Sequence, residues 1–457
     1  MTSWPDNKLL MHRRAFLKDC ALAATAVPLV RAATIPRPNV LFLLASQWRG
    51  QTLPGLPGVE LDAANLRRLA AEGIQLNRAY ACYPQSTPSR AALLTGRFPH
   101  ATGVRGDGIA LPLDQPSIAG SLKDSGYRTG FIGQWGLDGP SDPGYVPPGP
   151  RRRGFDDWAA FNRGYRYFDS LYFRDRPEAI RVNGFEPDGQ TDLAIQFLEQ
   201  NRQHPFYLFV SWGPPHPPRT PPLGTAQLYD SRWLMIRENV PANMGSKVRS
   251  EYSAYYALCA AIDQNIGRLL AALDRLTLGN DTIVVFTSDC GDMLGSQGLE
   301  DAGVPFEEST RVPLLIRYPR ALKGGIQRDD LLVSNVDLMP TLLALCGAQI
   351  PEGVQGKDLS AALMHEQTGG QESVFTEGNL GSFDEWRMLV RGLDKLVVDS
   401  KLDVTHLFNL GLDPFEMENL AREVSQELRR NELKALLRDW MRRTGDRIDA
   451  SGLKKRS

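Results

Sequence analysis

The sequence predicts an α/β fold, because strand-like apolar runs alternate with segments of helical periodicity. Residues 39–44 and 205–212 are nearly continuous apolar runs, as expected of parallel strands covered on both faces. Residues 281–288, with an apolar centre, predict a further strand. Residues 62–73 and 250–276 have the apolar spacing of amphipathic helices. Together these patterns predict a large sheet with helices packed against it.

The N-terminus has the features of a targeting segment. Arg13 and Arg14 precede Phe16-Leu17-Lys18 and a short, weakly apolar stretch, which is typical of a bacterial twin-arginine signal. Residues 1–32 are therefore predicted to direct export to the periplasm or beyond; a cytoplasmic basic amphipathic segment is the alternative. No stretch of 18 apolar residues follows, so no membrane span is expected.

The composition excludes some classes of partner. The chain has 457 residues and a formal net charge of −1, which gives no indication of a nucleic-acid partner. Its five cysteines show no paired spacing, so buried free thiols are expected rather than a disulfide framework. The length is enough for a large core.

Further elements can be placed along the chain. Shorter strands are expected at 74–79, 127–133 and 314–318, and helices at 117–126 and 191–201. Residues 138–190 are rich in Gly, Pro, Arg and aromatic residues and are expected to form a long irregular insertion at the rim of a site. Its arginines, at 151–153 and 163–166, could contact an anionic substrate; a solvated basic loop is the alternative.

The pattern changes from about residue 373. Residues 386–390 and 395–398 predict a β-hairpin, and a charged amphipathic helix is expected over 425–444. This part of the chain is therefore predicted to be a small C-terminal α+β subdomain.

A polar loop leads into a helix at residues 80–104. Ser86 lies just before Pro88, and Arg90 follows in the first turn. The free N–H groups of a first turn attract anions, and an arginine adds a bidentate donor. A nucleophile at Ser86 would face this positive end, whereas the simpler interpretation is a Ser/Thr cap on an ordinary helix.

The longer string resembles the signature of the sulfatase family. Ser86-x-Pro88-Ser89-Arg90 is followed by Leu94-Thr95-Gly96-Arg97 and by Pro99-His100. The resemblance implies the alkaline-phosphatase-like sandwich, in which a large mixed, mostly parallel sheet lies between helices. It also implies that Ser86, as in serine-type members, is the position oxidised to formylglycine, with a calcium or magnesium ion beside it.

The resemblance extends over residues 37–445. His216 matches a family Pro-Pro-His, where the histidine bonds the sulfate ester, and Asp289 matches a metal ligand. The segments Phe306–Ser309 and Arg311–Pro313 also match. The implied organisation is a signal peptide at 1–32, a sulfatase-like domain at 37–372, a C-terminal subdomain at 373–445 and a tail at 446–457.

Several positions depart from the family pattern. The positions where the family has metal ligands or cationic contacts to the sulfate are occupied here by Ala45, Ser46, Gln134, Gly136, Cys290 and Ala302. Ser46 and Asp292 could act only as weak additional metal ligands beside Asp289, since hard cations prefer several carboxylates. A metal site is therefore doubtful in this chain.

Three interpretations follow. The first is a degenerate sulfatase, or pseudoenzyme, that still binds sulfated glycans through Arg90, His216 and the rim arginines. The second is a working sulfatase with metal ligands from elsewhere, and the third is a related phosphoryl or phosphonate hydrolase. A sulfatase-maturating enzyme is a further expected partner if Ser86 is converted.

Overall fold

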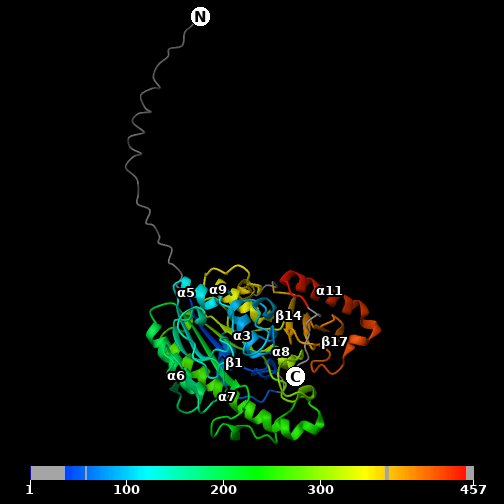
Figure 1. Cartoon of the computed structure of the whole chain (residues 1–457), viewed down its shortest axis with the longest axis horizontal. Coiled ribbons are helices and arrows are strands. Elements are labelled where there is room, and N and C mark those ends of the chain that lie inside the picture. Colours follow the sequence, from blue (N-terminus) through cyan, green and yellow to red (C-terminus); the bar gives the residue numbers. More distant parts are fainter. Residues whose placement is uncertain (2–36, 57–58, 366–369, 449–457) are drawn as a thin grey trace. The chain divides into compact units, whose positions relative to one another are not determined.

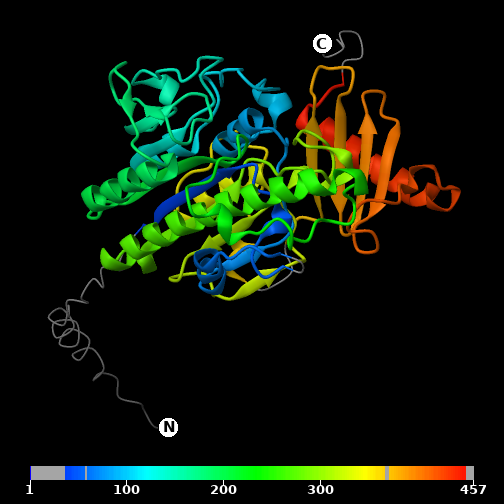
Figure 2. The ribbon, with the colours of Figure 1, turned by 90° about the horizontal axis from the view of Figure 1, so that it is seen from below.

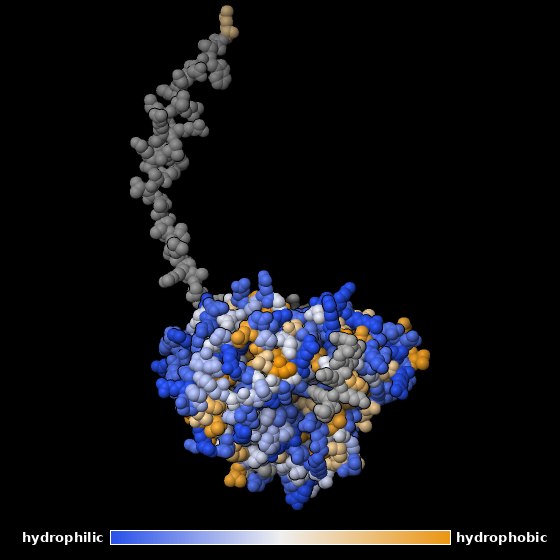
Figure 3. Space-filling model, in the orientation of Figure 1, coloured by the Kyte–Doolittle hydropathy of each residue, from blue (hydrophilic) through white to orange (hydrophobic). Residues whose placement is uncertain are grey.

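The computed structural model describes residue 1 and residues 37–56, 59–365 and 370–448. The predicted twin-arginine signal and the end of the predicted tail lie outside the described residues. Within the described part of the chain, no helix is both long and apolar enough to cross a membrane. The face drawn in Figure 3 is largely hydrophilic, with apolar residues in a few separate groups.

The core of the fold is an eight-stranded sheet with the order β12-β2-β11-β9-β1-β8-β4-β5. β1 pairs in parallel with both β8 and β9, and β4 pairs in parallel with β8 and β5. Only β11 runs antiparallel to its neighbours. The predicted α/β class is confirmed, with the sheet mixed and mostly parallel. The strand bounds are β1 Asn39–Ser46, β2 Ile74–Leu76, β4 Arg128–Gln134, β5 Asp157–Phe161, β8 Phe206–Pro215, β9 Thr282–Ser288, β11 Leu314–Arg317 and β12 Ile326–Arg328.

Helices cover both faces of this sheet (Figures 1 and 2). Alternate side chains of β1 explain why both faces must be covered, because Val40 and Phe42 enter one apolar core while Leu41 and Leu43 enter another. The second core also contains residues of α2 Ala64–Ala71, α6 Glu186–Asn201 and α7 Gly245–Arg275. The first contains residues of α3 Ser86–Thr95, α5 Ile118–Asp124, α9 Leu338–Leu345 and α10 Ser360–Met364.

The C-terminal part is a four-stranded antiparallel sheet with one long helix. The sheet order is β14-β15-β16-β17, and β15 and β16 form the predicted hairpin. Trp440 of the helix stacks on Phe375 of the sheet, with ring centroids 4.6 Å apart. The bounds are β14 Ser373–Gly378, β15 Trp386–Arg391, β16 Asp394–Asp399, β17 Val404–Asn409 and α11 Glu427–Thr444.

The segment 138–190 is more regular than the sequence indicates. β5 lies inside it and forms an edge of the main sheet, and β6 Leu171–Tyr172 and β7 Ile180–Arg181 form a small hairpin. The strand is only five residues long and lies among Gly, Pro and Arg, so its apolar pattern is too short to stand out. A wholly irregular insertion was therefore the wrong expectation.

Three short elements complete the surroundings of the site. A small sheet joins β3 Ala79–Tyr80, β10 Arg311–Val312 and β13 Val333–Ser334. α4 Pro99–Thr102 follows α3, and α8 Glu307–Thr310 precedes β10.

Candidate functional site

Ser86 is the first residue of α3. The preceding residue, Gln85, has extended backbone angles and occupies the N-cap position without a side-chain cap. The Ser86 Oγ instead lies 3.3 Å from the Ser46 Oγ at the end of β1. The simple interpretation of Ser86 as a helix cap is therefore not supported, because its hydroxyl is directed to another element.

Four strands deliver side chains to the same place. Ser46 ends β1, Gln134 ends β4, His216 follows β8, and Asp289 follows β9. These strands are parallel neighbours in the sheet, so their carboxyl ends meet at one edge, where ligands bind in folds of this class. The N-terminus of α3 faces this edge through the contact between Ser46 and Ser86.

Asp289 is the centre of a buried hydrogen-bond network. One of its carboxylate oxygens accepts from the Ser46 Oγ at 3.0 Å and from the Arg90 Nε at 3.2 Å. The other accepts from the backbone N–H of Gln47 at 3.1 Å. Arg90 and Asp289 have 4% and 0% of their side chains exposed, so this is a buried ion pair whose charges offset each other.

Gln134 accepts hydrogen bonds from the two terminal nitrogens of the Arg90 guanidinium. Arg90 donates to the backbone oxygen of Gln134 at 2.7 Å and to its side-chain Oε1 at 3.0 Å. The Gln134 amide nitrogen donates to the backbone oxygen of Gly164 at 3.4 Å. Where the resemblance leads one to expect a lysine, this chain therefore has a neutral side chain that ties Arg90 to a neighbouring loop.

His216 is fixed in orientation. Its Nδ1 lies 2.5 Å from the backbone oxygen of Pro217, and the Tyr165 ring stacks on the imidazole at 3.6 Å with an interplanar angle of 4°. Burial lowers the pKa of His216 below its ordinary value of 6.5. A neutral imidazole that donates from Nδ1 leaves Nε2 as an acceptor.

These groups line a cavity of about 270 Å³. The structure brings together in this cavity the predicted residues Ser86, Arg90 and His216 and the changed positions Gln134 and Gly136. The cavity lining also includes Thr87, Asp107, Asp142, Arg163, Gly164 and Tyr165. Tyr165 and Asp107 were not singled out from the sequence, because no periodicity or motif marks a lone tyrosine or aspartate in a loop.

Three other predicted positions, Asp292, Cys290 and Ala302, are not part of the cavity lining. The two carboxylate oxygens of Asp292 accept from the Leu294 N–H and from Arg219, so this side chain is engaged away from the cavity. Burial raises the pKa of the Cys290 thiol well above its ordinary value, which keeps it neutral. Ala302 is half-buried between β9 and α8 and is not part of the lining.

The five arginines of the predicted rim differ in what their side chains contact. Arg152 is buried, pairs with Asp175 and donates to backbone oxygens, and Arg153 donates to backbone oxygens. Arg151 pairs with Asp138, and Arg166 pairs with Asp142. Arg163 alone among these five lines the cavity.

The donors around Asp289 do not fit a hard divalent cation. Calcium takes six to eight oxygen ligands, several of them carboxylates, whereas this place offers one carboxylate and two serine hydroxyls. The Arg90 guanidinium already lies against that carboxylate. Ala45 provides no side-chain donor, and a neutral thiol is a poor ligand for calcium.

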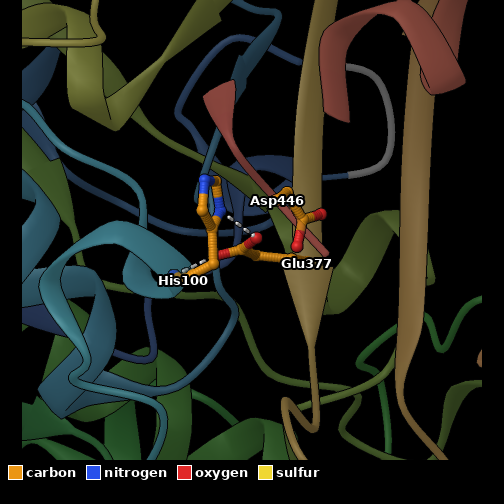
Figure 4. Close-up of side chains that lie close together, drawn as sticks. All are labelled: His100, Glu377 and Asp446. Carbon is orange, nitrogen blue, oxygen red and sulfur yellow. Dashed lines mark hydrogen bonds and ion pairs between the residues drawn. The ribbon is translucent and has the colours of Figure 1, made fainter. Parts of the chain in front are cut away.

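A second polar cluster lies outside the cavity. Figure 4 shows His100 of α4 directed toward Glu377 of β14, with Asp446 close by. The ligand atoms of these three residues lie within 4.8 Å of one another, a spacing that a metal ion could use. Here, however, His100 bonds Glu377 at 2.8 Å, and Arg387 bonds both oxygens of Asp446. Its groups thus already pair with one another.

Comparison with known proteins adds two family matches and several relatives. The family model described as Sulfatase matches residues 38–348, and the model described as N-sulphoglucosamine sulphohydrolase, C-terminal, matches residues 295–443. An ulvan-active sulfatase of Formosa agariphila is 31% identical over 422 residues, covering 90% of this chain and 82% of that protein.

Solved structures share the fold. A crystal structure of YidJ from Bacteroides fragilis has a TM-score of 0.84 at 30% identity, covering 90% of this chain and 97% of that one. A structure solved in complex with its substrate D-glucosamine-2-N,6-O-disulfate has a TM-score of 0.80 at 25% identity, covering 91% of this chain and all of that one.

Proposed function

The chain belongs to the sulfatase family, and we propose that it binds sulfated saccharides while hydrolysing their sulfate esters very slowly or not at all. The observation that supports the proposal is the cavity itself: Ser86, Arg90 and His216 line it together. Asp289, which the family resemblance assigns to the metal, is paired with Arg90. Relatives that act on sulfated glycans support the class of ligand.

The loss of catalysis follows from charge. Sulfate-ester cleavage needs positive charge on the sulfuryl oxygens, and removing one preorganised donor of this kind typically costs about 10²–10³-fold in kcat. Here Gln134 and Gly136 line the cavity without a charge, and the donors do not suit calcium. The loss of several such donors should lower kcat much more than the loss of one, although the separate effects do not simply add.

In this proposal the residues of the cavity bind and orient the sulfated group. The stacked His216 presents a fixed Nε2 to the cavity. The three guanidinium nitrogens of Arg90 are already bonded to Asp289 and Gln134, and the Thr87 N–H is bonded to Asp107. Ser86 stands where its hydroxyl, or a formylglycine made from it, faces the bound group. A family cation would supply electrophilic assistance at this place, but these residues do not form its coordination shell.

Binding and turnover can be tested separately. Isothermal titration calorimetry with D-glucosamine-2-N,6-O-disulfate should detect binding, and unsulfated glucosamine should bind at least about 10-fold more weakly, a difference of about 1.4 kcal/mol. In the same preparation, sulfate release should stay far below about 1 s⁻¹, the low end of ordinary enzymes. Release at that rate, abolished by Asp289→Ala, would instead establish a working sulfatase.

Conversion of Ser86 is a separate part of the proposal. The spacing Ser86-x-Pro88-x-Arg90 fits a substrate of a sulfatase-maturating enzyme, and oxidation to formylglycine removes two hydrogens. Mass spectrometry of the tryptic peptide that contains Ser86 measures this directly. An unmodified serine, in a host that converts other sulfatases, would reject conversion.

Export is proposed from the sequence alone. Arg13 and Arg14 lie outside the described residues, and their context is that of a twin-arginine signal. Replacing both with lysine should retain the protein in the cytoplasm, as cell fractionation and the size of the processed chain would show. Unchanged export would contradict the assignment.

A further inference from the structure

Most charged side chains around the cavity form ion pairs or hydrogen bonds with neighbouring residues. Arg90 lies on Asp289 at 3.2 Å, and Arg166 lies on Asp142 at 2.9 Å. Asp107 accepts a hydrogen bond from the Thr87 N–H at 3.3 Å. An anion that enters this cavity therefore meets ion pairs whose net charge is close to zero, unlike a site built around a free cation.

Arg163 is the exception. Its side chain is half-buried and lines the cavity together with Ser86 and His216. No carboxylate lies within ion-pairing distance of its guanidinium, and no side-chain hydrogen bond is made by it, among residues 37–56, 59–365 and 370–448. A guanidinium that faces a cavity without a partner is a free donor fork for an oxyanion.

The backbone that carries Arg163 is well anchored. The residue follows β5 at the edge of the main sheet, where Phe161 pairs with Gln134 of β4. The N–H groups of Asn162 and Arg163 both donate to the backbone oxygen of Pro143, at 2.5 and 3.2 Å. Arg163 thus follows the carboxyl end of a strand in the same sheet as the strands that carry the rest of the site. This anchoring positions its side chain more precisely than a free loop would.

A nearby glycine leaves space for the guanidinium. Gly108 has a φ of 77°, and a Cβ at that position would lie 3.0 Å from a terminal nitrogen of Arg163. The loop that carries Asp107 therefore passes close to the Arg163 side chain because it has no side chain at residue 108.

We propose that Arg163 is the residue that recognises the sulfate group of a saccharide in this cavity, supplying the uncommitted positive charge that Arg90 cannot supply. The inference rests on the proposed function and specifies its ligand: a saccharide whose anionic group is a sulfate ester, held by a planar guanidinium. A bidentate Arg–oxyanion pair gives geometric specificity as well as affinity. A lysine, as a point charge, should replace it only in part.

The test compares three single variants by calorimetry with D-glucosamine-2-N,6-O-disulfate. Arg163→Ala should weaken binding at least about 10-fold, and Arg163→Lys should weaken it less. Arg181→Ala is the matched control, since Arg181 lies in the same segment, is exposed and pairs with Asp169 outside the cavity. This control should bind like the unchanged protein. Thermal melting of all three should be similar, which separates recognition from folding.

Each outcome decides one claim. If the unchanged protein prefers the sulfated sugar and Arg163→Ala binds as well as Arg181→Ala, the role of Arg163 is overturned while the proposed function stands. If the unchanged protein does not distinguish sulfated from unsulfated sugar, the proposed function itself fails. Glucuronic acid, which carries a carboxylate and no sulfate, is the last ligand; binding as tight as that of the sulfated sugar would overturn the assignment to sulfate.

Discussion

Two clusters of charged side chains each contain a residue of the signature segment, Arg90 in one and His100 in the other. They differ in how their charges are used. In the cluster around Arg387, the buried carboxylates of Glu377, Glu385 and Asp446 all lie within 4 Å of one guanidinium. Beside the cavity, Arg90 pairs with one carboxylate, that of the buried Asp289. The first cluster joins α4, the C-terminal sheet and the residues after α11, whereas the second adjoins the cavity that Arg90 lines.

Residues that support the fold and residues that line the site are therefore largely separate in this molecule. Family segments that hold the chain together keep their partners: Asn335 bonds Ser89 at 2.7 Å, and Glu307 bonds the buried Lys395 at 3.2 Å. Two of the changed positions, Gln134 and Gly136, line the cavity. A chain can therefore keep a sulfatase fold while the electrostatics of its site differ.

The largest effect is expected in the supporting cluster. Arg387→Ala should lower the free energy of unfolding by about 3–5 kcal/mol, because it leaves several buried carboxylates without their cation. Urea unfolding monitored by tryptophan fluorescence measures this. A loss below about 1 kcal/mol would show that the cluster is not the fold support described above.

A calcium site should appear when the missing oxygens are returned to the cavity. The variant Ala45→Asp, Ser46→Asp, Cys290→Asn places three new oxygen ligands beside Asp289, and it should gain about 2.7 kcal/mol of stability at calcium concentrations 100-fold above its Kd. The unchanged protein should show no calcium-dependent shift in melting temperature. A shift of equal size in the unchanged protein would refute the assignment.

Restoring turnover should be harder than restoring the metal. Gly136 has a φ of 76°, and a Cβ there would lie 3.6 Å from the Arg90 Cδ. A histidine at this position therefore takes a strained backbone at a cost of about 1–3 kcal/mol. Adding Gln134→Lys to the calcium-binding variant is expected to raise sulfate release more than adding Gly136→His does, as a chromogenic aryl sulfate assay can compare.

The pH dependence of stability should identify His100. Burial by itself lowers the pKa of His100, but the Glu377 carboxylate outweighs it, and the net pKa lies above 6.5. A raised folded pKa gives stability that is complete below the unfolded pKa and is lost as pH rises through the folded one. The difference in unfolding free energy between the unchanged protein and His100→Asn should therefore shrink above pH 6.5. A constant difference from pH 5 to 9 would contradict this.

The smallest effect is expected at an exposed ion pair. Arg442 is 80% exposed and pairs with Asp439 on α11, so Arg442→Ala should change the unfolding free energy by less than about 0.5 kcal/mol. The same urea experiment as for Arg387 provides the measurement. A loss as large as that of Arg387→Ala would mean that burial does not separate the two clusters.

The edge of the sheet where the site lies could be predicted from the sequence, and the reason is physical. Ser46, His216 and Asp289 each end or follow an apolar run, and parallel strands bring their carboxyl ends together. By contrast, β5 was missed, because five residues among glycines and prolines do not show a period.

The partners of individual side chains could not be predicted. Asp289 and Asp292 lie three residues apart, and both were predicted as metal ligands, Asp292 only as a weak one. In the structure Asp289 joins the Ser46 network, while Asp292 pairs with Arg219. Arg152 and Arg163 likewise belong to one basic segment, and the first is buried as a structural donor while the second lines the cavity. Contacts between residues far apart in the sequence decide these partners, and the spacing of residues along the chain does not reveal such contacts.

The central claim, that this cavity binds a sulfated saccharide without a metal ion, is tested most directly by one calorimetric titration run twice. D-glucosamine-2-N,6-O-disulfate is titrated into the protein in the presence of EDTA and again with millimolar calcium. We expect the same Kd in both titrations, because the positive charge proposed to bind the sulfate belongs to Arg163, which lines the cavity. Binding that disappears in EDTA and returns with calcium would contradict it.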